Sequence, residues 1–535
     1  MSSIYGLFGG THDASVSLIV DGEIKFCLEE ERMTRIKSGN NYLATPRMSL
    51  NEVEIRSGIT VDDADYLVFS DHYPKKFASD LMLPFSTYNH HLCHAAGAYY
   101  TSGFEDDPCL VITIDGGGTS EFIQVYKAQG GKMEMVYTSP CSHSGSLGQL
   151  WAYSTMFCRG YDDSGEVIWK ASKDEGKLMG MAPDGEYDEK IYRMIRQIVD
   201  YKNLSFFPSD TLGRTLITVE HMRMLGWIDP PEGLAKFAYN LQKASEDMMR
   251  EFIHDIHMKF PGYNKLCLAG GLFANVKINQ VINELPWVEE IYVCPAMGDN
   301  GLSLGAAILK CRELREGFIK PTRFKNMHLG TSYKEDEISK RLLDSGFNFS
   351  RSYYDPTEVA KDLNEGKIIG WFAGGIEYGA RALGARSILC RPTDPDTHSK
   401  LNSRLSRYDT MPFAPVVLDE HFDKIFKTNK SKYSSEFMTI CYDTREEWHD
   451  RIPAVIQKSD KTARPQRAVR ESVPRYWNLI NEYYKLSGIP VLLNTSFNAH
   501  NEPIIDSPER AMKHLAEGIV DKLVIENYVY TRRQP

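Results

Sequence analysis

The beginning of the chain alternates apolar runs with short polar turns, a pattern that predicts strands joined by hairpins. Residues 4–8 form an apolar run that ends at Gly9-Gly10. Residues 15–20 and 23–28 then flank Asp21-Gly22, a dipeptide that favours a tight hairpin turn. We therefore expect a strand, a turn and a two-stranded hairpin at the start of the chain.

The same pattern returns further along the chain. Residues 110–114 form an apolar run followed by Asp115 and glycines, and residues 121–126 and 133–137 flank Gly130-Gly131. For either copy alone an ordinary hairpin is the alternative, although an aspartate beside a glycine turn also lets a phosphate or metal approach the backbone. Two copies of one pattern predict a duplicated α/β core. This duplication favours an actin-like architecture, in which two similar lobes enclose a cleft.

Two further apolar strands end in glycine turns that open helices, after a long predicted helix at 239–258. Residues 266–269 run into Gly270-Gly271, and Asn275 follows close behind. A second strand ends before Gly298-Asp299. A strand, a glycine turn and a helix start commonly offer backbone N–H groups to an anion. Gly270, Gly271 and Asn275 are therefore candidate ligand-binding residues.

The composition changes over residues 312–333, which mix charged residues with Gly and Pro and are typical of a linker. Beyond this segment another α/β unit begins, with a charged helix from Glu335 and apolar strands at 368–372, 491–493 and 523–530. We expect an α/β protein of two domains. The actin-like domain would cover residues 1–325, and a smaller α/β domain would cover residues 326–535.

Composition and charge exclude several classes of protein. Of 535 residues, 42% are hydrophobic and 25% are charged, as in soluble globular proteins. The 72 Asp and Glu against 62 Lys and Arg give a net charge of −10, which disfavours nucleic acid as a partner but leaves a local basic groove open. No apolar run approaches the roughly 18 residues of a membrane span. Acidic residues near the N-terminus argue against a secretory signal.

The ten cysteines are scattered without a CxxC pair, which is typical of reduced, mostly buried thiols. We therefore expect a soluble cytoplasmic protein. The sequence contains no GxSxG, no HExxH and no P-loop motif. A serine hydrolase, a zincin and a P-loop ATPase are accordingly unsupported.

A histidine pair is the first candidate for chemistry. His90 and His94 lie four residues apart, so on a helix they share a face and can bind one metal. His91 lies between them and is not expected to be a ligand of that metal. A coincidental pair is the alternative. The glycine turns at Asp115 and Asp299 supply two carboxylates, and such a set with open positions suits Fe(II), Mn(II) or Zn(II).

Basic residues in the second half are the next candidates. Arg381 and Arg386 lie five residues apart in a stretch of Gly and Ala rather than beside carboxylates. On an acidic protein, arginines in such surroundings indicate phosphate recognition, and a solvated basic face is the alternative. Further basic residues follow at Lys400, Arg404, Arg407 and Arg464.

Three other stretches of the sequence are weaker candidates for a functional role. A polar cluster at 494–498 ends a buried strand, where ligands of open α/β sheets usually bind, and an ordinary turn is its alternative. The charged runs at 29–37 and 174–180 are more typical of solvated helix faces.

These motifs, in this order, resemble the O-carbamoyltransferase family of antibiotic and nodulation-factor biosynthesis. The resemblance extends from residue 9 to about 510 and covers nearly the whole chain. Its matching stretches are His12-Asp13-Ala14-Ser15, Glu29–Lys37, His90-x-x-x-His94, Asp115-Gly116, Glu175–Gly180, Gly270-Gly271-x-x-x-Asn275, Gly298-Asp299-x-Gly301, Gly379–Ser387, Ala463–Gln466 and Asn494–Asn498.

The resemblance implies a first domain similar to the actin-like fold that transfers threonylcarbamoyl groups in tRNA modification, with a metal site. It implies a second domain similar to the fold that makes threonylcarbamoyl-adenylate. In such enzymes carbamoyl phosphate and ATP, with Mg, give carbamoyl-adenylate. The carbamoyl group then passes to an acceptor hydroxyl in the first domain.

The resemblance also implies roles for individual residues. Fe(II), or another divalent metal, would be held by His90, His94, Asp115 and Asp299, and Lys37 would touch the adenylate. Many members have an arginine where Met411 stands here, so Arg404 and Arg407 become candidates for that phosphate contact. Carbamoyl phosphate and ATP would be held by Arg381, Arg386, Arg464, Asn494, Ser496 and Asn498.

The acceptor hydroxyl needs a base, for which Asp13 and Glu175 are the candidates. We expect a small acceptor such as a sugar, an aminoglycoside or a polyketide, bound near residues 139–170. The alternatives are a hydroxymethylated nucleotide or DNA base as acceptor, an actin-like kinase, and a catalytically silent regulator that binds nucleotide and metal. A homodimer is one oligomeric state that the sequence leaves open.

Overall fold

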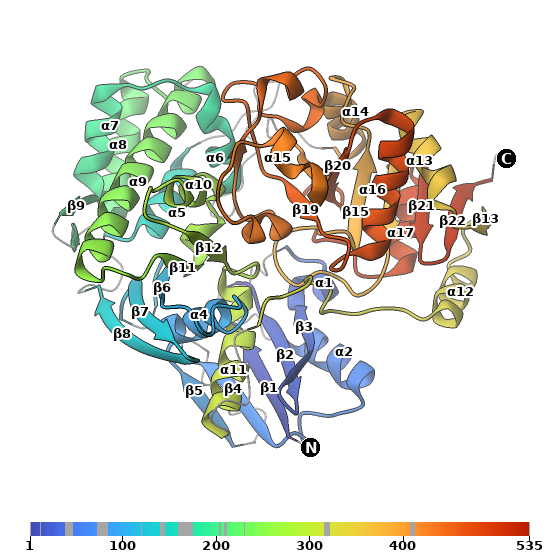
Figure 1. The fold of residues 1–535 in the computed structure, drawn as a ribbon, viewed down its shortest axis with the longest axis horizontal. Coiled ribbons are helices and arrows are strands. Elements are labelled where there is room, and N and C mark those ends of the chain that lie inside the picture. Colours follow the sequence, from blue (N-terminus) through green and yellow to red (C-terminus); the bar gives the residue numbers. More distant parts are fainter. Residues whose placement is uncertain are drawn as a thin grey trace.

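The structure is a computed structural model that describes residues 2–10, 12–37, 46–71, 84–118, 120–139, 145–158, 175–202, 205–207, 211–228, 231–314, 322–406 and 412–533. The first half contains two five-stranded sheets and the second half one eight-stranded sheet. The N-terminal and C-terminal halves lie side by side (Figure 1).

The first sheet has the strand order β3-β2-β1-β4-β5. β1 pairs antiparallel with β2 and parallel with β4, and Asp21-Gly22 makes the predicted turn between β2 and β3. The strands are β1 (Ser3–Phe8), β2 (Ser15–Val20), β3 (Glu23–Glu29), β4 (Tyr66–Ser70) and β5 (Phe85–Tyr88).

The second sheet repeats this topology. Its order is β8-β7-β6-β11-β12, with β6 antiparallel to β7 and parallel to β11. The strands are β6 (Cys109–Ile114), β7 (Ile123–Gln129), β8 (Lys132–Thr138), β11 (Lys265–Ala269) and β12 (Glu290–Val293). The predicted actin-like duplication is therefore confirmed.

The helices that follow the last strand of each sheet bring the two lobes together. α4 (His90–Tyr99) follows β5, and α11 (Leu302–Leu314) follows β12 through the short helix η3 (Asp299–Gly301). The two helices pack against each other between the sheets (Figure 1). Their N-terminal ends, where three of the four predicted metal ligands lie (His90, His94 and Asp299), consequently meet.

A helical layer covers the outer face of the second sheet (Figure 1). The predicted helix at 239–258 is part of the longer α9, whose apolar positions face the core. The layer contains α5 (Leu147–Phe157), α6 (Glu175–Met181), α7 (Glu189–Ile198), α8 (Thr211–Met224), α9 (Pro231–Lys259) and α10 (Val276–Asn283), with the strands β9 (Asp200–Lys202) and β10 (Ser205–Phe207).

The eight-stranded sheet has the order β13-β22-β21-β14-β15-β20-β16-β19. The single final strand predicted at 523–530 is in fact a hairpin, because Glu526 adopts a φ of 43° and turns the chain between β21 and β22. The strands are β13 (Phe349–Tyr353), β14 (Ile369–Phe372), β15 (Arg386–Cys390), β16 (Ala414–Leu418), β19 (Gln466–Ala468), β20 (Val491–Ser496), β21 (Lys522–Ile525) and β22 (Tyr528–Arg532).

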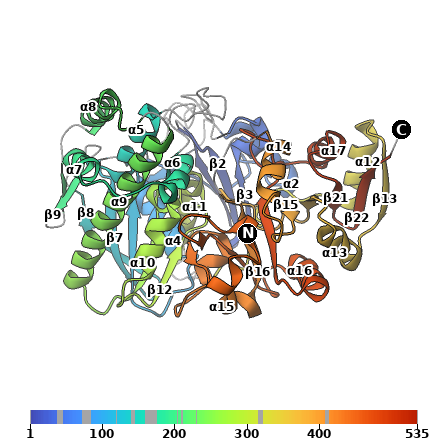
Figure 2. The ribbon, with the colours of Figure 1, turned by 90° about the horizontal axis from the view of Figure 1, so that it is seen from above.

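Helices pack on both sides of this sheet, and its β13 edge lies far from the α7–α9 layer (Figure 2). These helices are α12 (Glu335–Asp344), α13 (Pro356–Asn364), α14 (Thr397–Arg404), α15 (Phe422–Ile425), α16 (Pro474–Ser487) and α17 (Pro508–Ala516). A small sheet of β17 (Tyr442–Asp443) and β18 (Thr462–Ala463) lies beside it. No helix in the described ranges is both long enough and apolar enough to cross a bilayer.

The charged run at 29–37 differs from its prediction in how much of it is buried. The residues at 29–37 include the short helix α1 (Glu30–Thr34), and Glu29, Glu30 and Arg32 are all buried. The prediction of a solvated helix face is therefore wrong. Glu30 accepts hydrogen bonds from the first turn of α2 (Arg47–Ser57), through the N–H groups of Met48 and Ser49.

Candidate active site

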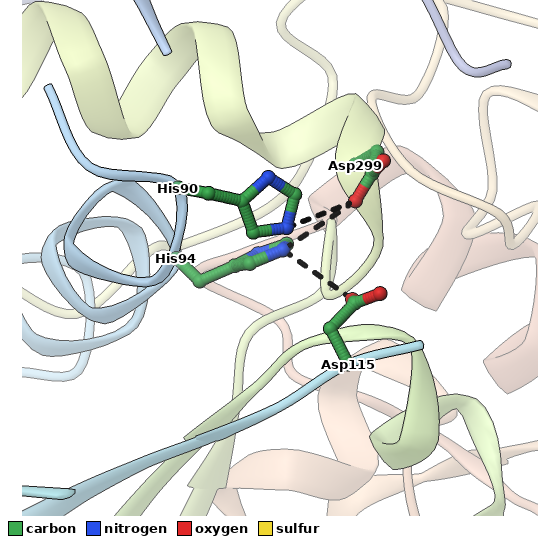
Figure 3. A group of neighbouring side chains, drawn as sticks. All are labelled: His90, His94, Asp115 and Asp299. Atoms are coloured by element: carbon green, nitrogen blue, oxygen red, sulfur yellow. Dashed lines mark ion pairs between the residues drawn. The ribbon is translucent and has the colours of Figure 1, made fainter. Parts of the chain in front are cut away.

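The predicted histidine pair lies in the first turns of α4. The Asn89 side chain caps this helix by accepting the Leu92 N–H at 3.0 Å, and Asp71 accepts the His90 N–H at 3.0 Å. His90 and His94 are both buried, and their rings project from one face of α4 (Figure 3). The i, i+4 spacing therefore does place the two imidazoles together.

Two carboxylates face these rings from the second lobe (Figure 3). Asp115 follows β6, and its carboxylate accepts the N–H groups of Gly116 at 2.5 Å and of Gly271 at 2.6 Å. Asp299 opens the short helix η3. Potential ligand atoms of His90, His94, Asp115 and Asp299 lie within 4.8 Å of one another. We call these four residues the His–Asp cluster.

The distances within the His–Asp cluster fit a metal ion better than direct hydrogen bonds. The His94 Nε2 lies 3.5 Å from both Asp115 Oδ2 and Asp299 Oδ1, and the His90 Nε2 lies 3.6 Å from Asp299 Oδ1. These separations are too long for ordinary hydrogen bonds. Ligand atoms about 2.0 to 2.2 Å from one ion lie about 3 to 3.5 Å from each other. The donor set therefore fits a divalent cation.

The pKa values of residues in the His–Asp cluster also favour a bound cation. Burial by itself lowers the pKa of His94, but Asp115 and Asp299 outweigh it and raise that pKa to about 9. Burial opposes ionisation of the Asp115 carboxyl, but hydrogen bonds and the nearby histidines hold its pKa well below the usual range. Two ionised carboxylates in a buried site favour a bound cation.

His91 lies outside the His–Asp cluster. Its Nδ1 is 2.9 Å from the Thr113 hydroxyl, and its Nε2 is 3.3 Å from the Glu121 carbonyl oxygen. Burial first, and then the neighbouring histidines, lower the pKa of His91 to about 4. The ring thus joins α4 to the second sheet as a neutral imidazole.

A cavity of about 360 Å³ adjoins the His–Asp cluster. The two base candidates, Asp13 and Glu175, both line it, and so does His12. The His12 Nδ1 lies 2.9 Å from Asp13 Oδ2 and 3.9 Å from Asp299 Oδ2. We call this space the first cavity; its remaining lining is Gly116, Gly148, Trp151, Gly176, Met179, Gly271, Leu272, Ala274, Asn275, Arg381 and Arg464.

A second cavity of about 280 Å³ lies against the C-terminal domain. It shares Gly176, Arg381 and Arg464 with the first cavity, so the two spaces adjoin at these residues. Its remaining lining is Lys37, Lys177, Ala380, Ala382, Asn402, Pro412, Phe413, Ala414, Met438, Asn494, Thr495, Ser496, Asn498, His500 and Asn501.

Two arginines stand where the cavities meet. Within the described residues, neither Arg381 nor Arg464 has a carboxylate within ion-pair distance, and the Nε atoms of both lack a hydrogen-bond partner. Burial, and then the charge of Arg464, lower the pKa of Arg381 to about 9. Two half-buried, unneutralised guanidinium groups are well suited to bind an anion such as a phosphate.

Comparison with known proteins gives the family of this chain. Residues 74–308 match the family described as Carbamoyltransferase N-terminus, and residues 360–532 match Carbamoyltransferase C-terminus. The chain belongs to the carbamoyltransferase family. The resemblance stated from the sequence motifs is thereby confirmed, and the protein is an enzyme of this class.

Two relatives in sequence cover most of this carbamoyltransferase. The uncharacterized protein MJ1058 of Methanocaldococcus jannaschii is 30% identical over 84% of this chain and 74% of that protein. Nodulation protein NolNO of Sinorhizobium fredii is 29% identical over 98% of this chain and 79% of that protein. Among solved structures, component A of the (R)-2-hydroxyglutaryl-CoA dehydratase of Acidaminococcus fermentans is 16% identical over 58% of this chain and 97% of that one, with a TM-score of 0.37.

Some predicted ligand-binding residues of the carbamoyltransferase have other partners. Arg386 is buried, donates to the carbonyls of Gly374, Ala385 and Thr331, and lines neither cavity. Arg404 forms a 2.8 Å ion pair with Asp521, also outside both cavities. The structure therefore does not bring these two arginines to the site.

The predicted glycine turn after β11 is only partly at the site. Gly271 lines the first cavity, whereas Gly270 adopts a φ of 100° with its Cα packed against the Ile114 backbone. Asn275 reaches the first cavity, but its amide also caps α10 and pairs with Gln242. These contacts give Gly270 and Asn275 evident structural roles.

The polar cluster at 494–498 does reach the second cavity through Asn494, Ser496 and Asn498, and Lys37 lines the same cavity. Arg407, Met411 and most of 139–170 lie outside the described residues. Sequence reasoning did not single out five polar lining residues: His12, Lys177, Asn402, His500 and Asn501. His12 and Lys177 belong to quoted motifs and so left a signal, whereas no pattern pointed to Asn402, His500 and Asn501.

Proposed function

We propose that this carbamoyltransferase is an ATP-dependent O-carbamoyltransferase that works in two steps. In the second cavity, carbamoyl phosphate loses phosphate to water and leaves carbamate, whose oxygen attacks the α-phosphorus of ATP and displaces pyrophosphate. In the first cavity, the carbamoyl group of the resulting carbamoyl-adenylate passes to a hydroxyl of a small-molecule acceptor, and AMP leaves. The observation that carries the proposal is the pair of unneutralised arginines lining both cavities.

Arg381 and Arg464 would act on the phosphate groups. Carbamoyl phosphate and ATP both carry concentrated negative charge, which repels an approaching nucleophile. Guanidinium groups at the junction of the cavities would neutralise this charge and align the reacting groups. Asn494, Ser496 and Asn498 would add hydrogen bonds from the C-terminal side of the second cavity, with Lys37 as a further cation.

The His–Asp cluster would hold a divalent cation, for which Fe(II) is our first choice. When bound, such an ion supplies Lewis acidity next to the first cavity. Residues of this chain would form the surroundings of the bound ion. The Gly116 and Gly271 N–H groups orient Asp115, and burial of His90 and His94 limits access by water.

The acceptor hydroxyl must lose a proton in the second step. The position of His12 suits it to accept this proton, with Asp13 orienting the ring through its 2.9 Å hydrogen bond. Asp13 would thus act through His12 rather than directly, and Glu175 is the other candidate on the cavity wall. Without metal, the hydrogen bond with Asp13 raises the pKa of His12 to about 10. A cation beside Asp299 would disfavour the protonated imidazole.

The test is release of pyrophosphate from ATP, with and without carbamoyl phosphate and with no acceptor. Release that requires carbamoyl phosphate is the expected result and would support adenylate formation. Formation of ADP would instead favour an actin-like kinase. No nucleotide turnover with any combination of substrates would favour a silent binding protein.

A further inference from the structure

The helix α1 follows directly after Glu29, the last residue of β3, and lies between the first sheet and the C-terminal domain (Figure 1). Glu29 is 5% exposed and Arg32 is 2% exposed. Burial of charged groups is costly unless they are paired and hydrogen-bonded. None of the roles assigned above to the cavities or the His–Asp cluster uses these two side chains.

Glu29 joins two loops that carry site residues. Its Oε1 accepts hydrogen bonds from the Asn300 side-chain amide and, at 3.1 Å, from the Gly379 N–H. Asn300 directly follows Asp299 of the His–Asp cluster. Gly379 lies two residues before Arg381. A single carboxylate oxygen therefore links the loop of the metal site to the loop of the anion site.

Arg32 completes this link. It forms ion pairs with Glu29 and Glu31, and its guanidinium donates to the Gly379 carbonyl at 2.8 Å. Both backbone groups of Gly379 are consequently held by the α1 region. The neighbouring Tyr378 hydroxyl also donates to the Asn300 carbonyl.

The two loops approach each other so closely that a side chain at Gly379 does not fit. Gly379 has a φ of 115°, and a Cβ there would lie 2.9 Å from the Pro295 carbonyl oxygen. Only glycine adopts this backbone conformation readily. The junction thus depends on close backbone contact as well as on the buried ion pair.

We propose that Glu29 and Arg32 are positioning residues that fix Arg381 relative to the His–Asp cluster. Among the described residues, no carboxylate lies within ion-pair distance of the Arg381 guanidinium. The backbone anchor at Gly379 therefore restricts the positions that its guanidinium can reach. The inference rests on the proposed function, in which Arg381 binds carbamoyl phosphate.

Another interdomain ion pair provides a matched control. Arg56 of α2 contacts Glu337 of α12 through two hydrogen bonds of 2.8 Å each, and both residues lie outside the cavity linings. Arg56→Lys removes an arginine from the same domain interface without touching the loops of the site. A general loss of interface stability would affect the Arg32 and Arg56 variants alike.

The experiment measures binding of carbamoyl phosphate by calorimetry and the KM for carbamoyl phosphate in pyrophosphate release. Removing a partner from a buried ion pair is strongly destabilising, so Arg32→Lys, which keeps the charge, is the main variant. Gly379→Ala disturbs the same junction without changing any charge. We expect both variants to raise Kd and KM about tenfold, with kcat within about twofold, and Arg56→Lys to change neither constant by more than about twofold.

A double-mutant cycle separates positioning from general damage. If Arg32 acts through Arg381, adding Arg32→Lys to Arg381→Lys should raise the Kd by much less than the tenfold seen alone. Equal effects of Arg32→Lys and Arg56→Lys, or full additivity with Arg381→Lys, would overturn the inference. Wild-type enzyme that binds carbamoyl phosphate but releases no pyrophosphate would contradict the proposed function, and the binding comparison would still decide the role of Arg32.

Discussion

The His–Asp cluster and the arginine pair, Arg381 and Arg464, present opposite charges to a ligand. The cluster has two largely covered carboxylates that face two imidazoles, and backbone N–H groups orient one of them, that of Asp115. The pair of Arg381 and Arg464 presents positive charge with no carboxylate partner among the described residues. We propose that the cluster holds a metal and that the arginine pair holds an anion. Two chemical tasks would then be assigned to two neighbouring groups of side chains.

The largest expected effect comes from breaking the anion site. Arg464→Met should reduce carbamoyl-phosphate-dependent pyrophosphate release by about 100- to 1000-fold, because it removes positive charge where the phosphates would bind. Its control is Arg404→Met, which removes an arginine that is paired with Asp521 outside both cavities. The control should change the rate less than about twofold. Equal losses in the two variants would contradict the assignment of the anion site.

A substitution in the His–Asp cluster should reduce metal binding rather than pyrophosphate release. His94→Ala removes the imidazole that faces both carboxylates, and we expect Fe(II) affinity to fall by more than about 100-fold, since even outer-shell contacts change metal affinity about 10- to 100-fold. Metal content after dialysis, measured by mass spectrometry, checks this prediction. Retention of stoichiometric metal by the variant would show that the cluster is not the metal site.

Removal of the metal should also lower stability. A ligand present at 100 times its Kd stabilises the native state by about 2.7 kcal/mol, so chelation of metal-saturated wild type should lower the midpoint of thermal unfolding. The His94→Ala protein should show no such response to the chelator. A response of equal size in both proteins would assign the stabilising metal to another place.

His91 lies on the same helix as the two histidines of the His–Asp cluster, but we expect its replacement to have a smaller effect. His91→Asn should leave metal content unchanged, since the ring nitrogens of His91 face Thr113 and the Glu121 carbonyl rather than the proposed position of the metal. It should lower the free energy of unfolding by about 1 to 3 kcal/mol, because it disturbs buried hydrogen bonds. Denaturant unfolding together with metal analysis distinguishes the two effects. Loss of metal with unchanged stability would reverse the assignment.

Patterns that are local in the sequence predicted the fold and the cluster well. The repeated strand and hairpin pattern predicted the duplicated sheets, because side-chain alternation and turn residues are encoded within a few positions. The spacing of His90 and His94 required only the helical period. Asp115 and Asp299 follow strand ends, and strand ends meet at one edge of each sheet.

Features that depend on distant partners could not be predicted in this way. Glu29 and Arg32 resemble residues of a solvated helix face, and their burial depends on Asn300 and Gly379, which are far away in the sequence. Arg386 has the same glycine-rich and alanine-rich surroundings as Arg381. Only the tertiary structure shows that Arg386 is used to satisfy buried carbonyl groups.

We propose that Arg381 and Arg464 serve formation of the adenylate and that the His–Asp cluster serves the transfer. The most direct test is carbamoyl-phosphate-dependent pyrophosphate release by the His94→Ala enzyme, freed of metal at the cluster and supplied with Mg and ATP. We expect a rate within about twofold of wild type, because the variant leaves Arg381 and Arg464 in place. Loss of pyrophosphate release in parallel with loss of the bound metal would contradict it.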